Sequence, residues 1–157
     1  MTVPRPPHLD DFDRAILRII QKNNLTPLRV IGEQVHLSAA AVQRRIRRMQ
    51  DEGVIVANVA VVNPDLVGRP ITIFIEVHTE RTPIDKLATL KEALSAPGVQ
   101  QCYFVTGDAD FMLVLNVATM SEYEAWARGF FDANPNVKWF RTIVVMDRVR
   151  VGLEVPV

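Results

Sequence analysis

The sequence is poor in three features that often settle a protein's class: it has a single cysteine, no long apolar run and no net charge. Cys102 has no possible partner in the chain, which excludes a framework of intrachain disulfides. No apolar run approaches the roughly 20 residues that a membrane-spanning helix needs. Residues 1–7 hold three prolines and no apolar core segment, so they indicate a short flexible arm and not a signal peptide. We therefore expect a cytoplasmic protein with no membrane partner.

Signals of catalysis are also scarce. The three histidines, His8, His36 and His78, lie in different segments without the spacing of a metal site. Gly107 stands without the further glycines of a phosphate-binding loop. Cys102 lies inside an apolar stretch, where a small buried hydrophobe is favoured over a nucleophile or redox thiol. The sequence predicts no catalytic residues, no metal, no cofactor and no enzymatic activity.

The zero net charge conceals an uneven distribution. Residues 1–62 carry nine Lys and Arg against six Asp and Glu, a net of +3, and residues 63–157 carry nine against twelve, a net of −3. Four of the N-terminal cations fall within five residues: Arg44, Arg45, Arg47 and Arg48. Local charge matters more than the sum for a nucleic-acid-binding protein. This cluster is either an ordinary solvated helix face or a DNA-binding surface.

Apolar residues recur at helical spacing in the first half of the chain. The pattern predicts three helices over about residues 9–52, the first beginning among acids that favour a helix N-terminus. Thr26 and Ser38 are predicted to cap the second and third helices, and Gly53 to close the third. Two close helices joined by a short turn predict a helix-turn-helix, although His36 occupies the turn position often filled by glycine. Histidine is enriched at positive φ, so the prediction stands.

The period then changes. Val54–Val62 is apolar and β-branched, which predicts a strand or small wing. Turn signals over residues 63–69 indicate a linker. We thus expect a flexible arm over residues 1–8, a DNA-binding domain over 9–62, and a second domain over 70–157.

From Pro70 the order of predicted elements is strand, helix, strand, strand, helix, strand. Thr82-Pro83 is predicted to open the first helix, which carries Leu87, Leu90 and Leu94, and Ser121 to cap the second. The last strand is predicted over Val137–Met146. This βαββαβ order is that of a ferredoxin-like domain. The fold class is α+β: a (winged) helix-turn-helix followed by a ferredoxin-like domain.

The start of the third helix carries the predicted contacts with double-stranded DNA. Gln43 suits adenine and Arg44 suits guanine in the major groove. Arg47 and Arg48 are better placed for phosphates, which supply affinity and register. The exposed N-terminal set is Ser38, Ala39, Ala40, Gln43 and Arg44.

An ordered set of motifs resembles the Lrp/AsnC family of feast/famine regulators: Leu9-Asp10-x-x-Asp13-x-x-Ile16-Leu17, Val35-His36-Leu37-Ser38, Val42-x-x-Arg45-Ile46-x-x-Met49-x-x-x-Gly53-Val54-Ile55, Asn63-Pro64-x-x-Val67-Gly68, Pro97-Gly98-Val99, Gly107-Asp108-x-Asp110 and Thr142-x-Val144-Val145-Met146. The resemblance covers nearly the whole chain. It implies a recognition helix over residues 38–50 and a regulation-of-amino-acid-metabolism (RAM) domain. It also implies dimers that associate through the sheet of that domain, higher assemblies such as tetramers or octamers, and an amino acid or related effector at the seam between dimers.

By position, the resemblance places the effector pocket on Thr106, Gly107, Asp108, Ala109 and Asp110, with Phe104, Met120, Ile143, Val144 and Val145 nearby. The chemistry of the loop suits this role, because Gly107 permits close approach and Asp110 offers a carboxylate to an α-ammonium group. The plain alternative is a hairpin turn, and the two roles are compatible. Ala109 is smaller than the aromatic residue of many relatives, which leaves the size of the effector open.

The sequence therefore predicts a DNA-binding transcription regulator that responds to a small effector. Two alternatives remain. One is a ferredoxin-like enzyme, which the fold alone does not exclude. The other is an oligomeric ligand-binding module that acts on protein partners, which the arginine cluster disfavours.

Overall fold

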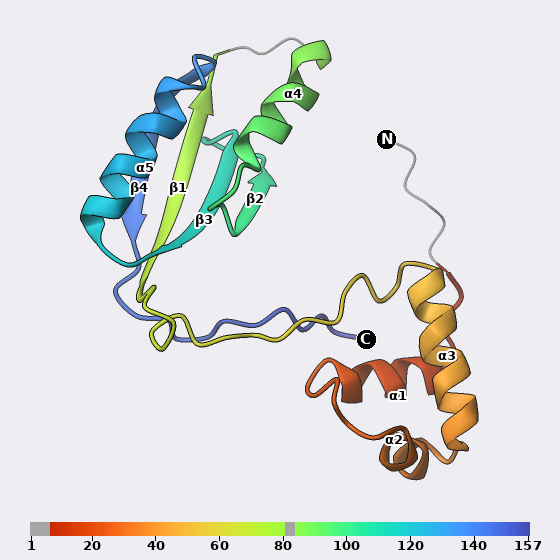
Figure 1. Ribbon diagram of the computed structural model, residues 1–157. Helices are drawn as coiled ribbons and strands as arrows, with labels where there is room; N and C mark the ends of the chain where they lie inside the picture. Colours follow the sequence, from red (N-terminus) through yellow and green to blue (C-terminus); the bar gives the residue numbers. More distant parts are fainter. Residues whose placement is uncertain (1–6, 81–83) are drawn as a thin grey trace. The chain divides into compact units, whose positions relative to one another are not determined.

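The computed structural model describes residues 7–80 and 84–157, and of the expected arm over residues 1–8 only the last two fall within that description. The chain divides into two compact units (Figure 1). The first comprises the residues up to Ala60 together with Arg150–Val157, and the second is Val61–Val149. Residues 150–157, expected with the second domain, thus group with the first unit, which they contact through residues 155–157. Over the described residues, no helix is both long and apolar enough to cross a membrane.

The first unit contains three helices, α1 (Asp11–Ile20), α2 (Leu28–Val35) and α3 (Ala39–Asp51). Their apolar stripes meet in one core built on Ile16, Ile31, Val42 and Met49, each at most 1% exposed. The predicted three-helix pattern is confirmed. Helical periodicity found these elements because each helix buries a single face.

Two details of the first unit differ from the sequence prediction. Thr26 does not cap α2: its hydroxyl donates to the carbonyl of Asn23 at 2.7 Å, and Pro27 occupies the N-cap without a side-chain hydrogen bond. The predicted strand or wing over Val54–Val62 is wrong, because these residues, all within the described chain, adopt no strand. The amides of Val54 and Ile55 both donate to the carbonyl of Met49 at the end of α3, and the valines beyond them are exposed.

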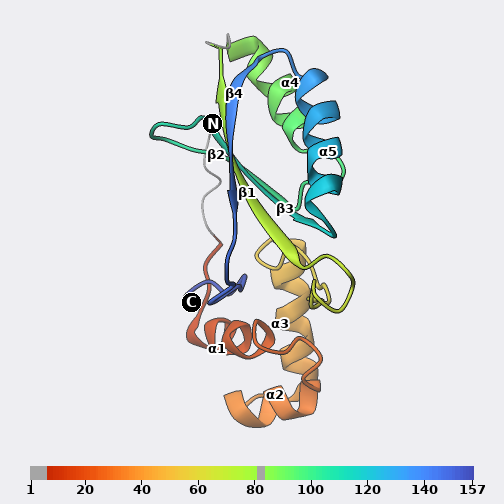
Figure 2. The same cartoon turned by 90° about the vertical axis from the view of Figure 1, so that its left-hand side faces the viewer.

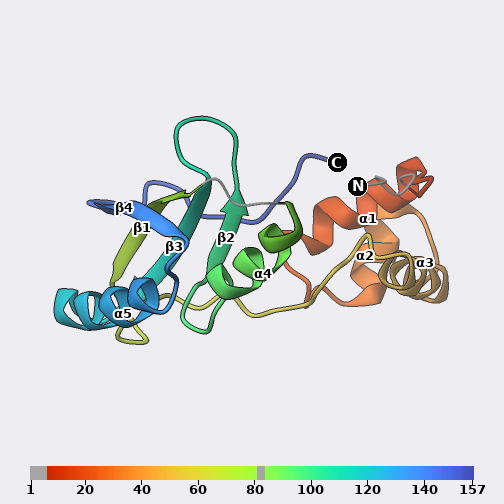
Figure 3. The ribbon, with the colours of Figure 1, turned by 90° about the horizontal axis from the view of Figure 1, so that it is seen from above.

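The second unit contains β1 (Ile71–Thr79), α4 (Ile84–Leu94), β2 (Gln101–Phe104), β3 (Phe111–Val117), α5 (Met120–Asp132) and β4 (Val137–Val144). The sheet order is β2-β3-β1-β4, with every neighbouring pair antiparallel. Figures 2 and 3 show α4 and α5 on one face of this sheet. The predicted βαββαβ, ferredoxin-like architecture is confirmed.

Alternation along the strands decides which side chains meet the helices. Ile73, Ile75 and Val77 on β1 are fully buried, and they join Leu113, Leu115 and the helix residues Leu90, Leu94, Tyr123 and Phe130 in the core of the second unit. The side chain of Leu87 and the helix start at Thr82-Pro83 lie outside the described residues. Thr119, not Ser121, caps α5, and β4 ends two residues before Met146.

Among the described residues, no helix lies on the other face of the sheet, which we call the open face (Figure 2). Phe74, Glu76 and His78 of β1 lie on it opposite Ile143, Arg141 and Trp139 of β4. The His78 and Trp139 rings stack with centroids 3.4 Å apart, and Arg141 Nε lies 2.5 Å from Glu76 Oε2. Phe74, Trp139 and Ile143 remain exposed.

Candidate nucleic-acid interface and ligand loop

The turn between α2 and α3 depends on two special positions. His36 caps α2 in the left-handed region, at φ 56° and ψ 41°, as the sequence predicted for a histidine in place of glycine. The Leu37 amide then donates to the carbonyl of Gly32 at 2.9 Å. A Cβ added to Gly32 would lie 2.4 Å from the Leu37 carbonyl oxygen, so only glycine allows the two segments this approach.

Helix α3 begins with a side-chain cap, because Ser38 Oγ accepts from the Ala41 amide at 3.2 Å. Val42 and Met49 are buried against the unit core. The predicted readout residues lie on exposed positions: Ser38, Ala39, Ala40, Gln43, Arg44, Arg47 and Arg48. A row of polar and small side chains therefore reaches solvent from a helix whose opposite side is fixed in the core.

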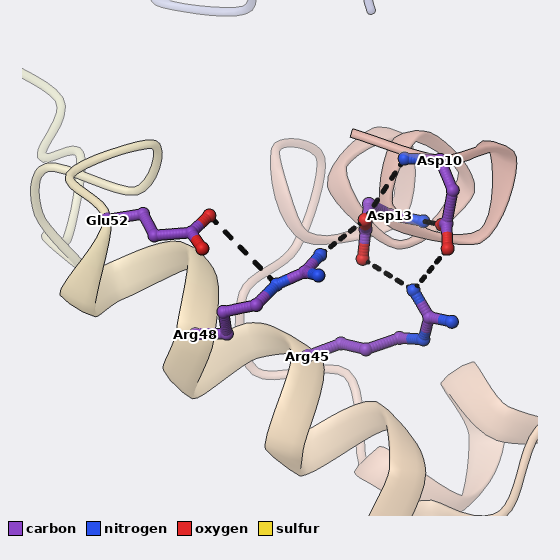
Figure 4. Close-up of polar contacts among 5 residues, drawn as sticks. All are labelled: Asp10, Asp13, Arg45, Arg48 and Glu52. Atoms are coloured by element: carbon purple, nitrogen blue, oxygen red, sulfur yellow. Dashed lines mark hydrogen bonds and ion pairs between the residues drawn. The ribbon is translucent and has the colours of Figure 1, made fainter. Parts of the chain in front are cut away.

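The four arginines of α3 do not share one environment. Arg45 and Arg48 turn toward α1, where they bind the capping carboxylates (Figure 4). Arg45 Nη1 lies 2.7 Å from Asp10 Oδ2 and 2.9 Å from Asp13 Oδ1. Arg48 Nη2 lies 2.5 Å from Asp13 Oδ2. Only Arg44 and Arg47 have no hydrogen bond or ion pair recorded among the described residues.

Asp13 is the centre of this cluster. Its side chain is 1% exposed, and it also accepts from the Asp10 amide at 3.1 Å while Asp10 accepts from the Asp13 amide at 2.9 Å. This reciprocal pair is a capping box that begins α1. A buried carboxylate needs such compensation. The cluster therefore fixes α3 against the N-terminus of α1.

The charges in the cluster stabilise one another. The hydrogen bond from the Asp13 amide, and then the one from Arg45, lower the pKa of Asp10. The bonds to Asp10 and Asp13 raise the pKa of Arg45. Sequence reasoning missed Arg45 as a functional position, although its spacing from Val42 and Met49 places it on the inward side of the helix.

In the second unit, the predicted ligand loop connects β2 to β3 over residues 105–110 and projects on the side of the sheet away from the helices (Figures 2 and 3). Gly107 lies at φ 122°, and apart from its chain neighbours no described residue has an atom within 4 Å of an added Cβ. The backbone here therefore stands open to solvent. Phe104, at the base of the loop, is exposed and its ring lies under Lys91 Nζ, 4.6 Å from the centroid.

Asp110 already holds the base of this loop. Its Oδ2 accepts from the Thr79 amide at 2.7 Å and from the Thr79 hydroxyl at 2.9 Å. Its own amide donates to the Val77 carbonyl at 3.0 Å, and its carbonyl accepts from the Val105 amide at 2.9 Å. Asp110 is thus a structural anchor whose carboxylate faces the end of β1.

The predicted effector residues fall into two groups within one chain. The loop with Phe104 lies at the end of β1 near Thr79, whereas Val144 pairs with Ile73 and Val145 bonds to Thr72 at the other end. Thr79 and Ile73 are six positions apart on β1, which is about 20 Å at 3.3 Å a residue. Met120 follows β3 at the same end as Ile143–Val145, because Val117 pairs with Ile71. One chain therefore does not bring all these residues together.

Two further predictions from the sequence concern the single cysteine and metal binding. Cys102 pairs with buried Leu113 and packs against the core, and burial raises the pKa of its thiol, so the thiol is disfavoured as a nucleophile. Among residues 7–80 and 84–157, no group of three or more His, Cys, Asp or Glu side chains is arranged to hold a metal ion.

Comparison with known proteins agrees with both halves of the molecule. Residues 9–50 match the AsnC-type helix-turn-helix domain, and residues 72–153 match the Lrp/AsnC ligand binding domain. The HTH-type transcriptional regulator y4tD of Sinorhizobium fredii is 42% identical over 150 residues, which cover 95% of this chain and 89% of the relative. Among solved structures, an AsnC family transcriptional regulator from Agrobacterium tumefaciens superposes with a TM-score of 0.87 at 29% identity, covering 94% of this chain and 97% of that one. A transcriptional regulator of Neisseria meningitidis, solved as an L-Met complex, also has a TM-score of 0.87, at 22% identity over 95% and 97% of the two chains.

A helix-turn-helix joined to a ligand-binding domain defines a DNA-binding transcriptional regulator. The chain belongs to the Lrp/AsnC family. The matched families and relatives are regulators and not enzymes, which agrees with the predicted lack of catalytic activity.

Proposed function

We propose that α3 reads DNA through Gln43 and Arg44, while Arg47 binds phosphate. The observation that carries this proposal is the division of the arginines: Arg45 is bound to carboxylates on α1, whereas Arg44 and Arg47 are exposed. Arg48 adds a second phosphate contact through the part of its guanidinium that neither Asp13 nor Glu52 engages, since Nη2 binds Asp13 and Nε lies 4.0 Å from Glu52. Ser38, Ala39 and Ala40 at the start of α3 let the helix approach base edges closely.

The effector of the proposed site is an amino acid. Support comes from the match to a ligand-binding domain and from the L-Met complex of the Neisseria protein. The chemistry fits as well: Asp110 offers a carboxylate, and the open backbone of Gly107 suits a bound carboxylate group. The sites comprise Phe104, Thr106, Gly107, Asp108, Ala109, Asp110, Met120, Ile143, Val144 and Val145.

Self-association completes this site. Because about 20 Å separates the two groups of effector residues in one chain, we infer that a second copy supplies the missing group. The open face is the dimer interface: Phe74, Trp139 and Ile143 are exposed there. Tetramers or octamers then form from these dimers, with the effector at the seam between them.

Regulation follows by linkage in this proposal. An effector that binds one assembly more tightly shifts the population toward it, and DNA affinity changes accordingly. The protein acts in the cytoplasm, on pseudo-palindromic operators read by paired recognition helices.

A panel of the twenty amino acids in a thermal-shift assay tests the effector proposal, because a ligand that binds only the folded form raises the apparent melting temperature. We expect stabilisation by at least one amino acid and its loss in Asp110→Ala. Thr79→Val is the matched control, since it removes the hydroxyl bond to the Asp110 carboxylate but keeps the carboxylate itself. The proposed contact between Asp110 and the ammonium group is contradicted if both variants lose the thermal stabilisation equally. It is also contradicted if Asp110→Ala keeps that stabilisation.

A further inference from the structure

Residues 155–157 are anchored on α1, although the chain reaches them from the second unit. Gln21 Nε2 donates to the Val155 carbonyl at 3.1 Å, and the Val155 amide donates back to Gln21 Oε1 at 2.8 Å. Arg18 Nε donates to the Val157 carbonyl at 2.6 Å. Val157 packs partly buried against the core of the first unit. Three hydrogen bonds and one apolar contact thus hold this segment.

The anchoring is confined to the end of the segment. Val151 and Leu153 are 76% and 70% exposed, and neither forms a hydrogen bond with another residue of the described ranges. Residues 150–154 therefore act as a short tether between Val149, in the second unit, and the anchor at Val155. Val149 and Val155 are six positions apart, so the tether spans at most about 22 Å even when fully extended.

The helix that receives the anchor also supports the recognition helix. Asp10 and Asp13 at the N-terminus of α1 bind Arg45 and Arg48 of α3, while Arg18 and Gln21 at its other end bind residues 155–157. At the other end of the tether, Arg148 pairs with Asp65 in the second unit. The Arg148–Asp65 ion pair therefore connects the residues just before the tether with the linker turn near the start of the second unit.

We propose that residues 155–157 form a clasp that gives the two units a second connection and restricts how far the recognition helix can move from the second unit. A single linker leaves the DNA-binding unit a wide range of positions. Two short connections allow far fewer, so a dimer presents its recognition helices at a narrower range of separations. The clasp thereby sets the tolerance for half-site spacing in DNA. The effect on half-site spacing rests on the proposed function, because it requires that α3 bind DNA.

The test uses the full chain with Val157→Asp, which places a charge against the apolar core, and Val151→Asp as the matched control at an exposed tail position. Hydrogen exchange reports the clasp without DNA: we expect the Val155 amide of Val157→Asp to exchange at least about tenfold faster, as an opened segment does. DNA affinity is then measured for a selected operator and for versions with two base pairs inserted or removed between half-sites. The wild type and Val151→Asp should lose about tenfold or more on this change, and Val157→Asp less than about threefold, because spacing is read through geometry.

Gln21→Leu provides a second variant that removes both hydrogen bonds to Val155 without adding charge, and it should reproduce the effect. Faster exchange with unchanged spacing preference would overturn the restricting role of the clasp. Unchanged exchange in both variants would overturn the clasp itself. If no DNA is bound by the wild type, the proposed DNA readout fails, while the exchange result still decides whether the segment is anchored.

Discussion

Arg45 reaches from α3 to α1, where its Nη1 lies 2.9 Å from the carboxylate oxygen Oδ1 of the buried Asp13. An arginine that belongs to the basic cluster of the sequence thus positions α3 against α1. The other carboxylate oxygen of Asp13, Oδ2, accepts a hydrogen bond from Arg48 Nη2. The orientation of α3 consequently depends on one buried acid.

Asp13→Ala should lower the free energy of unfolding of the first unit by about 2–3 kcal/mol, because it removes the charged hydrogen bonds to Arg45 and Arg48 together with one half of the capping box. Hydrogen exchange of the slowest amides in α1–α3 measures this loss. Asp11→Ala, at an exposed position in the same first turn, is the control and should change stability by less than about 1 kcal/mol. Equal losses in the two variants would remove the special role of Asp13.

The lowered pKa of Asp10 predicts a pH dependence with a defined sign. A carboxyl whose folded-state pKa lies below its unfolded value stabilises the fold above the unfolded pKa of 3.8, and the contribution is lost as pH falls through the folded value. In urea unfolding, the stability advantage of the wild type over Asp10→Asn should therefore be present at pH 5 and shrink below about pH 4. An advantage independent of pH over this range would argue against the charged interaction.

Gly32→Ala should destabilise the first unit by about 1–3 kcal/mol, because the new Cβ would lie 2.4 Å from the Leu37 carbonyl oxygen and the turn would have to shift. Gly129→Ala on α5 is the matched control. No atom lies within 4 Å of its added Cβ, so helix propensity should make it stabilising by up to about 1 kcal/mol. Urea midpoints of the two variants should move in opposite directions.

Arg44→Ala and Gln43→Ala should relax base preference in a selection from random DNA, because these exposed side chains are the proposed base readers. Arg47→Ala should instead weaken all sequences alike and reduce the slope of log K against log salt by about 0.9, the value for one lost phosphate contact. Arg128→Ala on α5 serves as a charge-matched control. If Arg47→Ala instead changes base preference, then Arg47 reads bases and the proposed phosphate contact is wrong.

How much the sequence alone revealed depends on the range of the interactions involved. Helix and strand periodicity correctly predicted α1–α3 and the βαββαβ order, because each of these elements buries one regular face. Periodicity misread Val54–Val62, because β-branched residues suit a strand only when another strand is available to pair with them. The predicted caps at Thr26 and Ser121 were also wrong: the Thr26 hydroxyl bonds back to Asn23 while Pro27 takes the N-cap of α2, and Thr119 caps α5 two residues before Ser121.

Local composition and spacing determined the helix-turn-helix, the ferredoxin-like order and the positive φ of His36, all of which depend on residues close in sequence. Only the tertiary structure distinguished Arg45 and Arg48 from Arg44 and Arg47, because their partner Asp13 lies more than 30 residues away. The tertiary structure also showed that the predicted effector residues lie in two groups along the sheet. It further showed that Val155 bonds to Gln21, 134 residues away in sequence. Such contacts are decided when the core assembles, since burial selects which distant polar groups must pair.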